Sequence, residues 1–134
     1  MRPFKLSNGT VLKVVIGDNS DQVEFEYKSM CAAMNREIVT DAVFPVVEDS
    51  YYSDVLDTVG VKYAGYMLSC VGDQVSVPLN EATRQLLAMS LCKLHSGGFV
   101  HGDPRIQNAL WHNNAVKWID FRDSVNVTTK VNMR

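Results

Sequence analysis

Three polar residues toward the end of the chain stand at a spacing that suits phosphoryl transfer. Asp103 is followed five positions later by Asn108, and Asp120 comes twelve positions after that. A carboxylate can take the proton of an attacking hydroxyl group, while an amide oxygen and a second carboxylate are hard ligands for a divalent cation. The spacing predicts a site in which Asp103 acts as the base and Asn108 and Asp120 hold Mg²⁺ or Mn²⁺.

A helix is expected before this stretch. Over residues 78–94 the apolar residues recur at intervals of three and four, which is typical of an amphipathic helix. Asn80 can act as its N-cap, and Gly97 with Gly98 should end it. This helix would support the chain that carries Asp103.

A hairpin is expected around the same residues. Residues 99–100 can form a short strand into the loop, residues 109–111 a strand out of it, and residues 115–121 the returning strand. Asn113 and Asn114 separate the last two, and such a pair favours a tight hairpin turn. The predicted order is therefore helix, loop, hairpin and carboxylate.

This combination resembles the protein-kinase superfamily. The sequence HGDPRIQN at residues 101–108 matches the H-x-D-x-x-x-x-N catalytic loop, and Asp120-Phe121-Arg122 stands where the family has D-F-G. The resemblance implies an α+β, kinase-like fold in a single compact domain over residues 1–134. Residues 1–70 would form a reduced N-lobe and the hinge, and residues 71–134 a truncated C-lobe.

The resemblance also implies roles for individual residues. ATP would bind with Mg²⁺ or Mn²⁺ held by Asn108 and Asp120, and Asp103 would orient or deprotonate the acceptor hydroxyl. Arg105 replaces the usual lysine and can still present positive charge to a phosphate, because a guanidinium matches it bidentately. His101 would hold the loop against the metal-binding turn and take no part in the chemistry.

The N-terminal part offers a lysine for the nucleotide. Residues 4–6 and 10–16 flank a Ser-Asn-Gly turn, which predicts a hairpin with Lys13 in its second strand. A lysine in a β-branched run usually lies on the solvent face of a strand. The resemblance instead implies that Lys13 holds the nucleotide phosphates.

A helix is predicted over residues 21–34, and it carries two glutamates. Glu26, followed one turn later by Met30, matches the family's helix glutamate and would pair with Lys13. Glu24 is the competing residue, but Lys28 lies four positions beyond it and predicts an exposed ion pair.

Two apolar runs follow, over residues 42–47 and 61–71, and both suit strands. The polar, Tyr-rich residues 48–57 would connect them. The resemblance implies that the second run enters the hinge, where backbone groups meet the adenine edge. The hinge candidates are Leu68, Ser69, Cys70 and Val71; a plain buried strand is the alternative.

The chain also departs from the family pattern. No Gly-rich loop precedes Lys13, and thirteen residues follow Phe121, which leaves no room for an activation segment or for helices that bind a peptide. Gly102 replaces the usual arginine. The resulting His-Gly-Asp sequence is more similar to that of small-molecule and atypical kinases than to that of ordinary protein kinases. Arg122 replaces the glycine of D-F-G and puts the freedom of that turn in doubt.

Composition narrows the expected partners. The chain has 134 residues with a net charge of −2, which argues against a nucleic-acid or anionic-membrane surface. Its three cysteines have no metal-ligand spacing, which suggests a reduced, intracellular protein. No apolar stretch approaches the length of a membrane span.

Two functions fit these observations. The first is a miniature, atypical kinase-like phosphotransferase that uses ATP and Mg²⁺ to phosphorylate a hydroxyl group on an unidentified acceptor. The second is a pseudokinase-like binding module for a protein partner, with weak or no catalysis. A homo-oligomer or a larger partner completing the truncated site would reconcile the two, and transfer of the nucleotide moiety is a third possibility.

Overall fold

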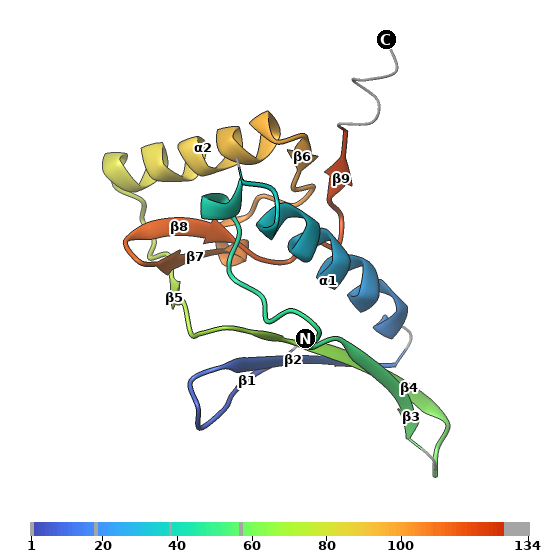
Figure 1. Cartoon of the computed structure of the whole chain (residues 1–134). Helices are drawn as coiled ribbons and strands as arrows, with labels where there is room; N and C mark the ends of the chain where they lie inside the picture. The colour runs from blue at the N-terminus through green and yellow to red at the C-terminus, as the bar shows by residue number, and fades with distance from the viewer. Residues whose placement is uncertain (1, 18, 38, 57, 128–134) are drawn as a thin grey trace.

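The chain folds as an α+β protein with small antiparallel sheets, as the sequence predicts. The computed structural model describes residues 2–17, 19–37, 39–56 and 58–127 (Figure 1). Within these ranges there are two α-helices, α1 (Ser20–Met34) and α2 (Glu81–Ser96). The strands form one four-stranded sheet, one three-stranded sheet and one two-stranded sheet.

The four-stranded sheet belongs to the N-terminal half and has the order β1-β2-β4-β3. Every neighbouring pair in it is antiparallel, and its strands are β1 (Arg2–Lys5), β2 (Val11–Ile16), β3 (Tyr52–Leu56) and β4 (Val61–Leu68). The predicted first hairpin is present: the Asn8 side chain accepts a hydrogen bond from the Thr10 amide at 3.1 Å, and Gly9 has a φ of +88°. Glycine adopts this left-handed conformation without steric cost.

Helix α1 covers one face of this sheet and packs on β4 (Figure 1). Val23, Glu26, Met30 and Ala33 recur at intervals of three and four and form its buried face. Three of these side chains are apolar, so the helix is held by the burial of apolar surface. The carboxylate of Glu26 is carried into the interior with them.

The predicted strand over residues 42–47 is wrong. The segment begins in the short 3₁₀ helix η1 (Thr40–Ala42) and continues as extended chain with only isolated bridges, Val43 to Trp118 and Val46 to Leu68. Pro45 lies between these bridges and has no amide hydrogen, so it cannot donate to a continuous ladder. Val43, Phe44 and Val46 are buried because the segment runs between the two larger sheets.

The prediction of a polar connection over residues 48–57 is also wrong, because this segment contains β3. All five residues of β3 are exposed, and among the described strands it pairs with β4 alone, at the edge of the sheet. A strand with neither face buried lacks the alternation of apolar and polar residues by which strands are recognised. The strand predicted over residues 61–71 is shorter than expected and ends at Leu68.

The C-terminal half follows the predicted order of helix, loop and hairpin. The Asn80 side chain caps α2 by accepting from the Thr83 amide at 2.8 Å. The predicted return strand over residues 115–121 is shorter and ends at Trp118. Asn113 and Asn114 have φ values of 52° and 63°, as a type I′ hairpin turn requires. The remaining elements are β5 (Asp73–Gln74), β6 (Phe99–Val100), η2 (Ile106–Asn108), β7 (Ala109–His112), β8 (Ala115–Trp118) and β9 (Val125–Asn126).

One cluster of buried apolar residues joins the two halves. Tyr66 and Phe44 from the first half and Phe99, Trp118 and Phe121 from the second are all almost fully buried in it. Figure 1 shows α2 on the far side of the β7–β8 hairpin from the four-stranded sheet. The segment after η1 bridges both sheets, so the halves are fixed relative to each other by packing as well as by the chain.

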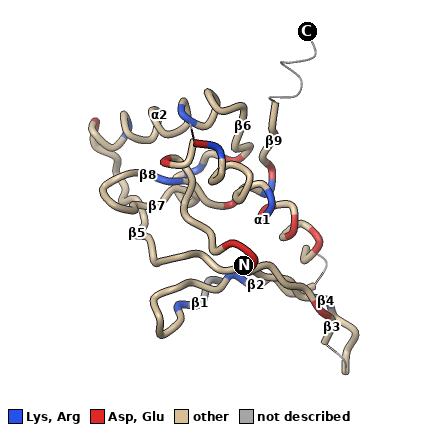
Figure 2. Tube along the Cα trace, in the orientation of Figure 1, with Lys and Arg blue, Asp and Glu red and all other residues tan. Residues whose placement is uncertain are grey.

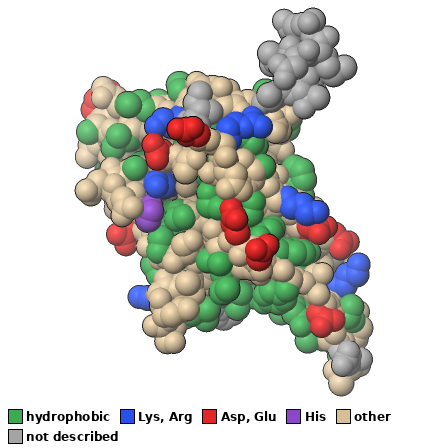
Figure 3. Space-filling model, viewed as in Figure 1, with side chains coloured by type: hydrophobic (Ala, Val, Ile, Leu, Met, Phe, Trp, Pro, Cys, Tyr) green, Lys and Arg blue, Asp and Glu red, His purple; other side chains and the backbone are tan. Residues whose placement is uncertain are grey.

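The surface carries charges of both signs. Residues of both signs are scattered along the trace in Figure 2, and on the face in Figure 3 they are interspersed with apolar side chains. Among the described residues, neither helix has the length and apolar character needed to cross a bilayer.

The sheet allows us to predict the effect of one glycine substitution. A Cβ added at Gly65 would lie 2.4 Å from the carbonyl oxygen of Lys13 on the neighbouring strand. Gly65→Ala should therefore lower the free energy of unfolding by about 1–3 kcal/mol in urea denaturation, the usual cost of overpacking. Ser53→Ala, at an exposed position on the same sheet, is the control and should change it by less than about 0.5 kcal/mol. Equal stability of Gly65→Ala and the parent would contradict this packing.

Candidate functional site

His101 fastens the loop that carries Asp103. Its Nδ1 accepts a hydrogen bond from the Asp103 amide at 3.1 Å, so Nε2 carries the ring hydrogen and donates to the carbonyl oxygen of Ile119 at 2.7 Å. The buried ring lies 5.3 Å from Trp118 and 5.0 Å from Phe121 between centroids. His101 thus ties the loop to the turn before Asp120, which is the structural role expected for it.

Gly102 lets the same loop lie directly against the chain after Phe121. Its φ is +91°, and a Cβ at this position would lie 2.0 Å from the carbonyl oxygen of Asp123. Any side chain here would therefore collide with backbone and also sit in a strained left-handed conformation. The fold cannot accept the arginine that the kinase motif usually has at this position.

Asp103 is engaged by two neighbours. Arg105 donates to both of its carboxylate oxygens, from Nε and from Nη2, each at 2.8 Å. The Asn108 amide nitrogen donates to the Asp103 carbonyl at 2.9 Å and to the carboxylate at 3.3 Å. The hydrogen bonds and charge of Arg105 lower the pKa of Asp103, and the carboxylate in turn raises the pKa of Arg105. Asp103 is therefore ionised, with both oxygens occupied.

Asn108 and Asp120 stand at the start and after the end of the β7–β8 hairpin. The Ile119 amide donates to the Asn108 carbonyl at 2.9 Å, which brings the two segments together. Because the Asn108 amide nitrogen is bonded to Asp103, its oxygen is the end of the side chain that remains for a ligand. Asp120 has a φ of 61°, a left-handed conformation that Asp tolerates better than most residues.

These two side chains could supply hard oxygen ligands to Mg²⁺ or Mn²⁺, with the other positions taken by phosphate and water. The described residues include no group of three or more His, Cys, Asp or Glu side chains that could hold a metal without such help.

Lys13 and Glu26 form a buried ion pair, as predicted. The Lys13 Nζ lies 3.0 Å from the Glu26 Oε1, and their side chains are 7% and 1% exposed. Glu24 pairs with Lys28 at 3.5 Å on the exposed face of α1, which resolves the choice between the two glutamates. An uncompensated buried charge is costly, so each member of the Lys13–Glu26 pair fixes the position of the other.

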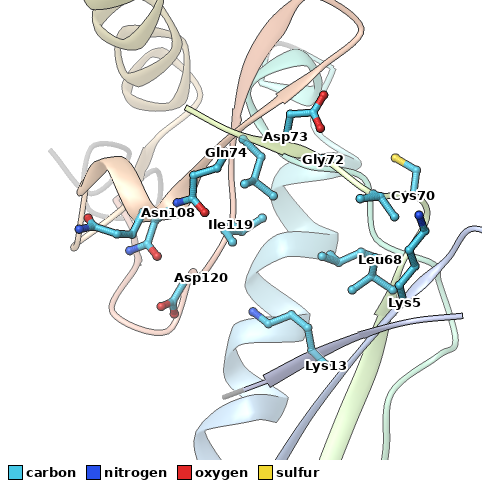
Figure 4. A pocket seen from close by; sticks show the side chains of 14 residues that line it. Lys5, Lys13, Leu68, Cys70, Gly72, Asp73, Gln74, Asn108, Ile119 and Asp120 are labelled. Carbon is cyan, nitrogen blue, oxygen red and sulfur yellow. The ribbon is translucent and has the colours of Figure 1, made fainter. Parts of the chain in front are cut away.

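A cleft of about 540 Å³ lies between the four-stranded sheet and the β7–β8 hairpin. Figure 4 shows Lys13 extending from β2 into the same space as Asp120 and Asn108. The volume of the cleft is within the usual range for small-molecule sites. The other lining residues include three of the predicted hinge positions, Leu68, Cys70 and Val71.

Four predicted residues lie outside this lining: Ser69, Glu26, Asp103 and Arg105. Ser69 is exposed, and its amide donates to the Pro45 carbonyl at 3.0 Å. Glu26 lies behind Lys13, where it reaches the cleft only through the lysine. Asp103 and Arg105 sit beside the cleft and connect to it through Asn108.

Sequence reasoning missed several residues at this site. Tyr66 was part of a predicted strand, yet its hydroxyl lies 3.2 Å from the Lys13 Nζ. Its contact depends on the β2–β4 register, which places Tyr66 opposite Lys13. Lys5 lines the cleft from β1, and Gln74 and Gln107 line it from the C-terminal half. No local motif marks these positions.

Comparison with known proteins gives one partial similarity. No family model matches the chain. Over 50 residues it is 38% identical to a protein of Methanocorpusculum labreanum described as a probable bifunctional tRNA threonylcarbamoyladenosine biosynthesis protein. The matched segment is 37% of this chain and 10% of that protein, so the chain spans only a small part of this relative.

The contribution of the Asp103–Arg105 pair to stability should depend on pH. Because the pKa of Asp103 is lowered, the pair should stabilise the protein fully above the ordinary Asp pKa of about 3.9 and lose this effect as the pH falls through the lowered pKa. In Arg105→Met the Asp103 pKa, measured by carboxyl ¹³C NMR titration, should move upward. Lys28→Met, which breaks an exposed pair elsewhere, should leave it unchanged. An Asp103 titration that does not respond to Arg105→Met would show that the pair is absent in solution.

Proposed function

We propose that this chain is a small kinase-like phosphotransferase that uses ATP and Mg²⁺ to phosphorylate a hydroxyl group. The main support for the proposal is the set of side chains that meet at one cleft. A lysine held by a buried glutamate faces an amide and a carboxylate suited to a divalent cation, although these residues come from opposite ends of the chain. The catalytic-loop motif itself contains neither Lys13 nor Glu26, so the meeting of this pair with Asn108 and Asp120 in one cleft adds support beyond that motif.

Each side of the cleft has a part in binding. Lys13 positions the nucleotide phosphates, and Glu26 orients Lys13. Leu68, Cys70 and Val71 line the end of the cleft where the base would lie, with the backbone of Ser69 next to them. Asn108 and Asp120 would hold the magnesium ion, which would neutralise charge on the phosphates.

The chemical step is a direct transfer. The acceptor oxygen forms a bond to the γ-phosphorus, the bond from that phosphorus to the β–γ bridging oxygen breaks, and ADP leaves. The hydroxyl proton passes to the Asp103 carboxylate. Asp103 must first exchange hydrogen bonds, since Arg105 and Asn108 occupy its oxygens. Arg105 is exposed and can turn its guanidinium toward the transferred phosphoryl group.

The same engagement of Asp103 favours a second candidate function. In a binding module with weak or no catalysis, a closed Asp103–Arg105 pair would simply hold the loop in shape. The cleft would then serve to bind a nucleotide or a protein partner, and another copy of the chain or a larger protein would complete the surface. The description of the Methanocorpusculum labreanum relative supports a setting in tRNA threonylcarbamoyladenosine biosynthesis for either function.

The metal assignment can be tested by thermal unfolding with ATP and Mg²⁺. A ligand at one hundred times its dissociation constant should stabilise the parent by about 2.7 kcal/mol. Asp120→Asn should lose the part of this stabilisation that depends on Mg²⁺. Asp123→Asn, two residues beyond the Asp-Phe pair and exposed, is the matched control and should respond like the parent. A full magnesium-dependent response in Asp120→Asn would show that the metal residue is wrongly assigned.

Catalysis and binding are separated by a second pair of variants. Asp103 acts mainly in the transition state, so Asp103→Ala should lower turnover by about 100-fold or more and leave ATP affinity nearly unchanged. Lys13→Met should weaken both, because Lys13 contacts the phosphates already in the ground state. Steady-state kinetics and ATP titration calorimetry measure the two effects. Equal loss of ATP affinity in both variants would make Asp103 a structural residue, and ATP binding without turnover in the parent would favour the binding module.

A further inference from the structure

Tyr66 is a buried phenol at the centre of the Lys13–Glu26 pair. It lies opposite Lys13 in the β2–β4 ladder, so both side chains leave the sheet on the same face, toward α1. Its side chain is fully buried, and its hydroxyl oxygen accepts a hydrogen bond from the Lys13 Nζ at 3.2 Å. The Nζ also lies 5.4 Å from the centre of the Tyr66 ring, within reach of a cation–π interaction.

The Lys13 ammonium group is therefore held from two directions. Glu26 holds it from α1 through Oε1, and Tyr66 holds it from β4. An ammonium group has three N–H donors, so two contacts within the protein leave one donor for a ligand. Lys13 lines the cleft, and two fixed donors orient the third.

A neutral second partner suits this purpose better than another carboxylate. Burial, with a further contribution from the Glu26 carboxylate, raises the pKa of the Tyr66 phenol well above its usual value. The phenol therefore stays neutral and orients Lys13 without cancelling its charge. The Tyr66 hydroxyl in turn donates to the Met30 Sδ at 3.5 Å, which fixes the direction of its lone pairs.

We propose that Tyr66 is a positioning residue for the nucleotide phosphates, acting by holding the Lys13 ammonium group so that its remaining donor points into the cleft. This inference rests on the proposed function, because it assumes that the cleft binds a nucleoside phosphate. It assigns a role to the strand residue opposite Lys13 in addition to the roles of Lys13 and Glu26.

The first test compares ATP with adenosine by titration calorimetry. Tyr66→Phe keeps the ring and removes the hydroxyl group. It should weaken ATP binding by about three- to tenfold, the scale of one ordinary hydrogen bond, and leave adenosine binding unchanged. Adenosine has no phosphate for Lys13 to contact, so a general distortion of the cleft would weaken both ligands. An equal loss for ATP and adenosine, or unchanged ATP binding, would overturn the proposal.

Tyr27→Phe is the matched control. Tyr27 packs against Tyr66, with 5.6 Å between ring centroids, and its hydroxyl accepts from the Asp49 amide at 2.7 Å, away from Lys13. This variant loses a hydroxyl group from the same aromatic cluster and should bind ATP like the parent. If both tyrosine variants weaken ATP binding equally, the effect belongs to the packing of the cluster and the proposal fails.

The second test does not need a nucleotide. The rate at which an amine-reactive N-hydroxysuccinimide ester labels Lys13 is measured by mass spectrometry, relative to Lys62, which is exposed. Loss of the Tyr66 hydroxyl should raise the relative labelling of Lys13 severalfold, and Tyr27→Phe should not. Unchanged labelling in Tyr66→Phe would overturn the proposal. If the parent binds neither ATP nor adenosine, the proposed function fails, while increased labelling would still show that Tyr66 holds Lys13.

Should Tyr66→Phe not fold, Met30→Leu provides the second variant. It removes the thioether acceptor of the Tyr66 hydroxyl and leaves the hydrogen bond to Glu26, so it should produce the same changes at a smaller size. No change in ATP binding or in Lys13 labelling in Met30→Leu would then count against the proposal.

Discussion

The buried pair of Lys13 and Glu26 is the constraint on which the N-terminal half depends. Two charges removed from water are tolerated only when they lie close together in good geometry. Lys13 comes from β2 and Glu26 from α1, so the pair fixes the helix against the sheet. Tyr66 adds the neighbouring strand to the same contact. The pair forms when β2 and α1 pack so that Lys13 faces the cleft. The fold and the proposed function therefore require the same arrangement.

The other side of the cleft is fixed by backbone contacts. His101 bonds both the loop and the turn before Asp120, and Gly102 allows the loop to lie against the backbone of Asp123. Asn108 joins the two by bonding to Asp103 through its side chain and to Ile119 through its carbonyl. The segment after η1 completes the frame, since its isolated bridges connect it to both larger sheets. The residues facing Lys13 are thus held by several independent contacts.

Local signals explain what could be predicted from the sequence. Residue types at a fixed spacing predict the Asn80 helix cap and the Asn113-Asn114 turn. The Lys13–Glu26 pair was predicted from the family resemblance together with the spacing of Glu26 and Met30. The segment at residues 42–47 was mistaken for a strand because burial between two sheets produces the same apolar run as a strand. β3 was missed because an exposed edge strand has no alternation. Tyr66 could not be assigned without the strand register.

We propose that Lys13 holds the phosphates, and the Asn108–Asp120 pair the metal ion, of one metal–nucleotide complex. NMR line broadening by Mn²⁺ with ATP tests this directly, because the paramagnetic ion broadens only nearby signals. The account predicts selective broadening of the amide signals of Asn108 and Asp120 and of the side-chain signals of Lys13, with β3 signals such as Val55 unaffected. Broadening centred on another surface, or none at saturating ATP and Mn²⁺, would contradict it.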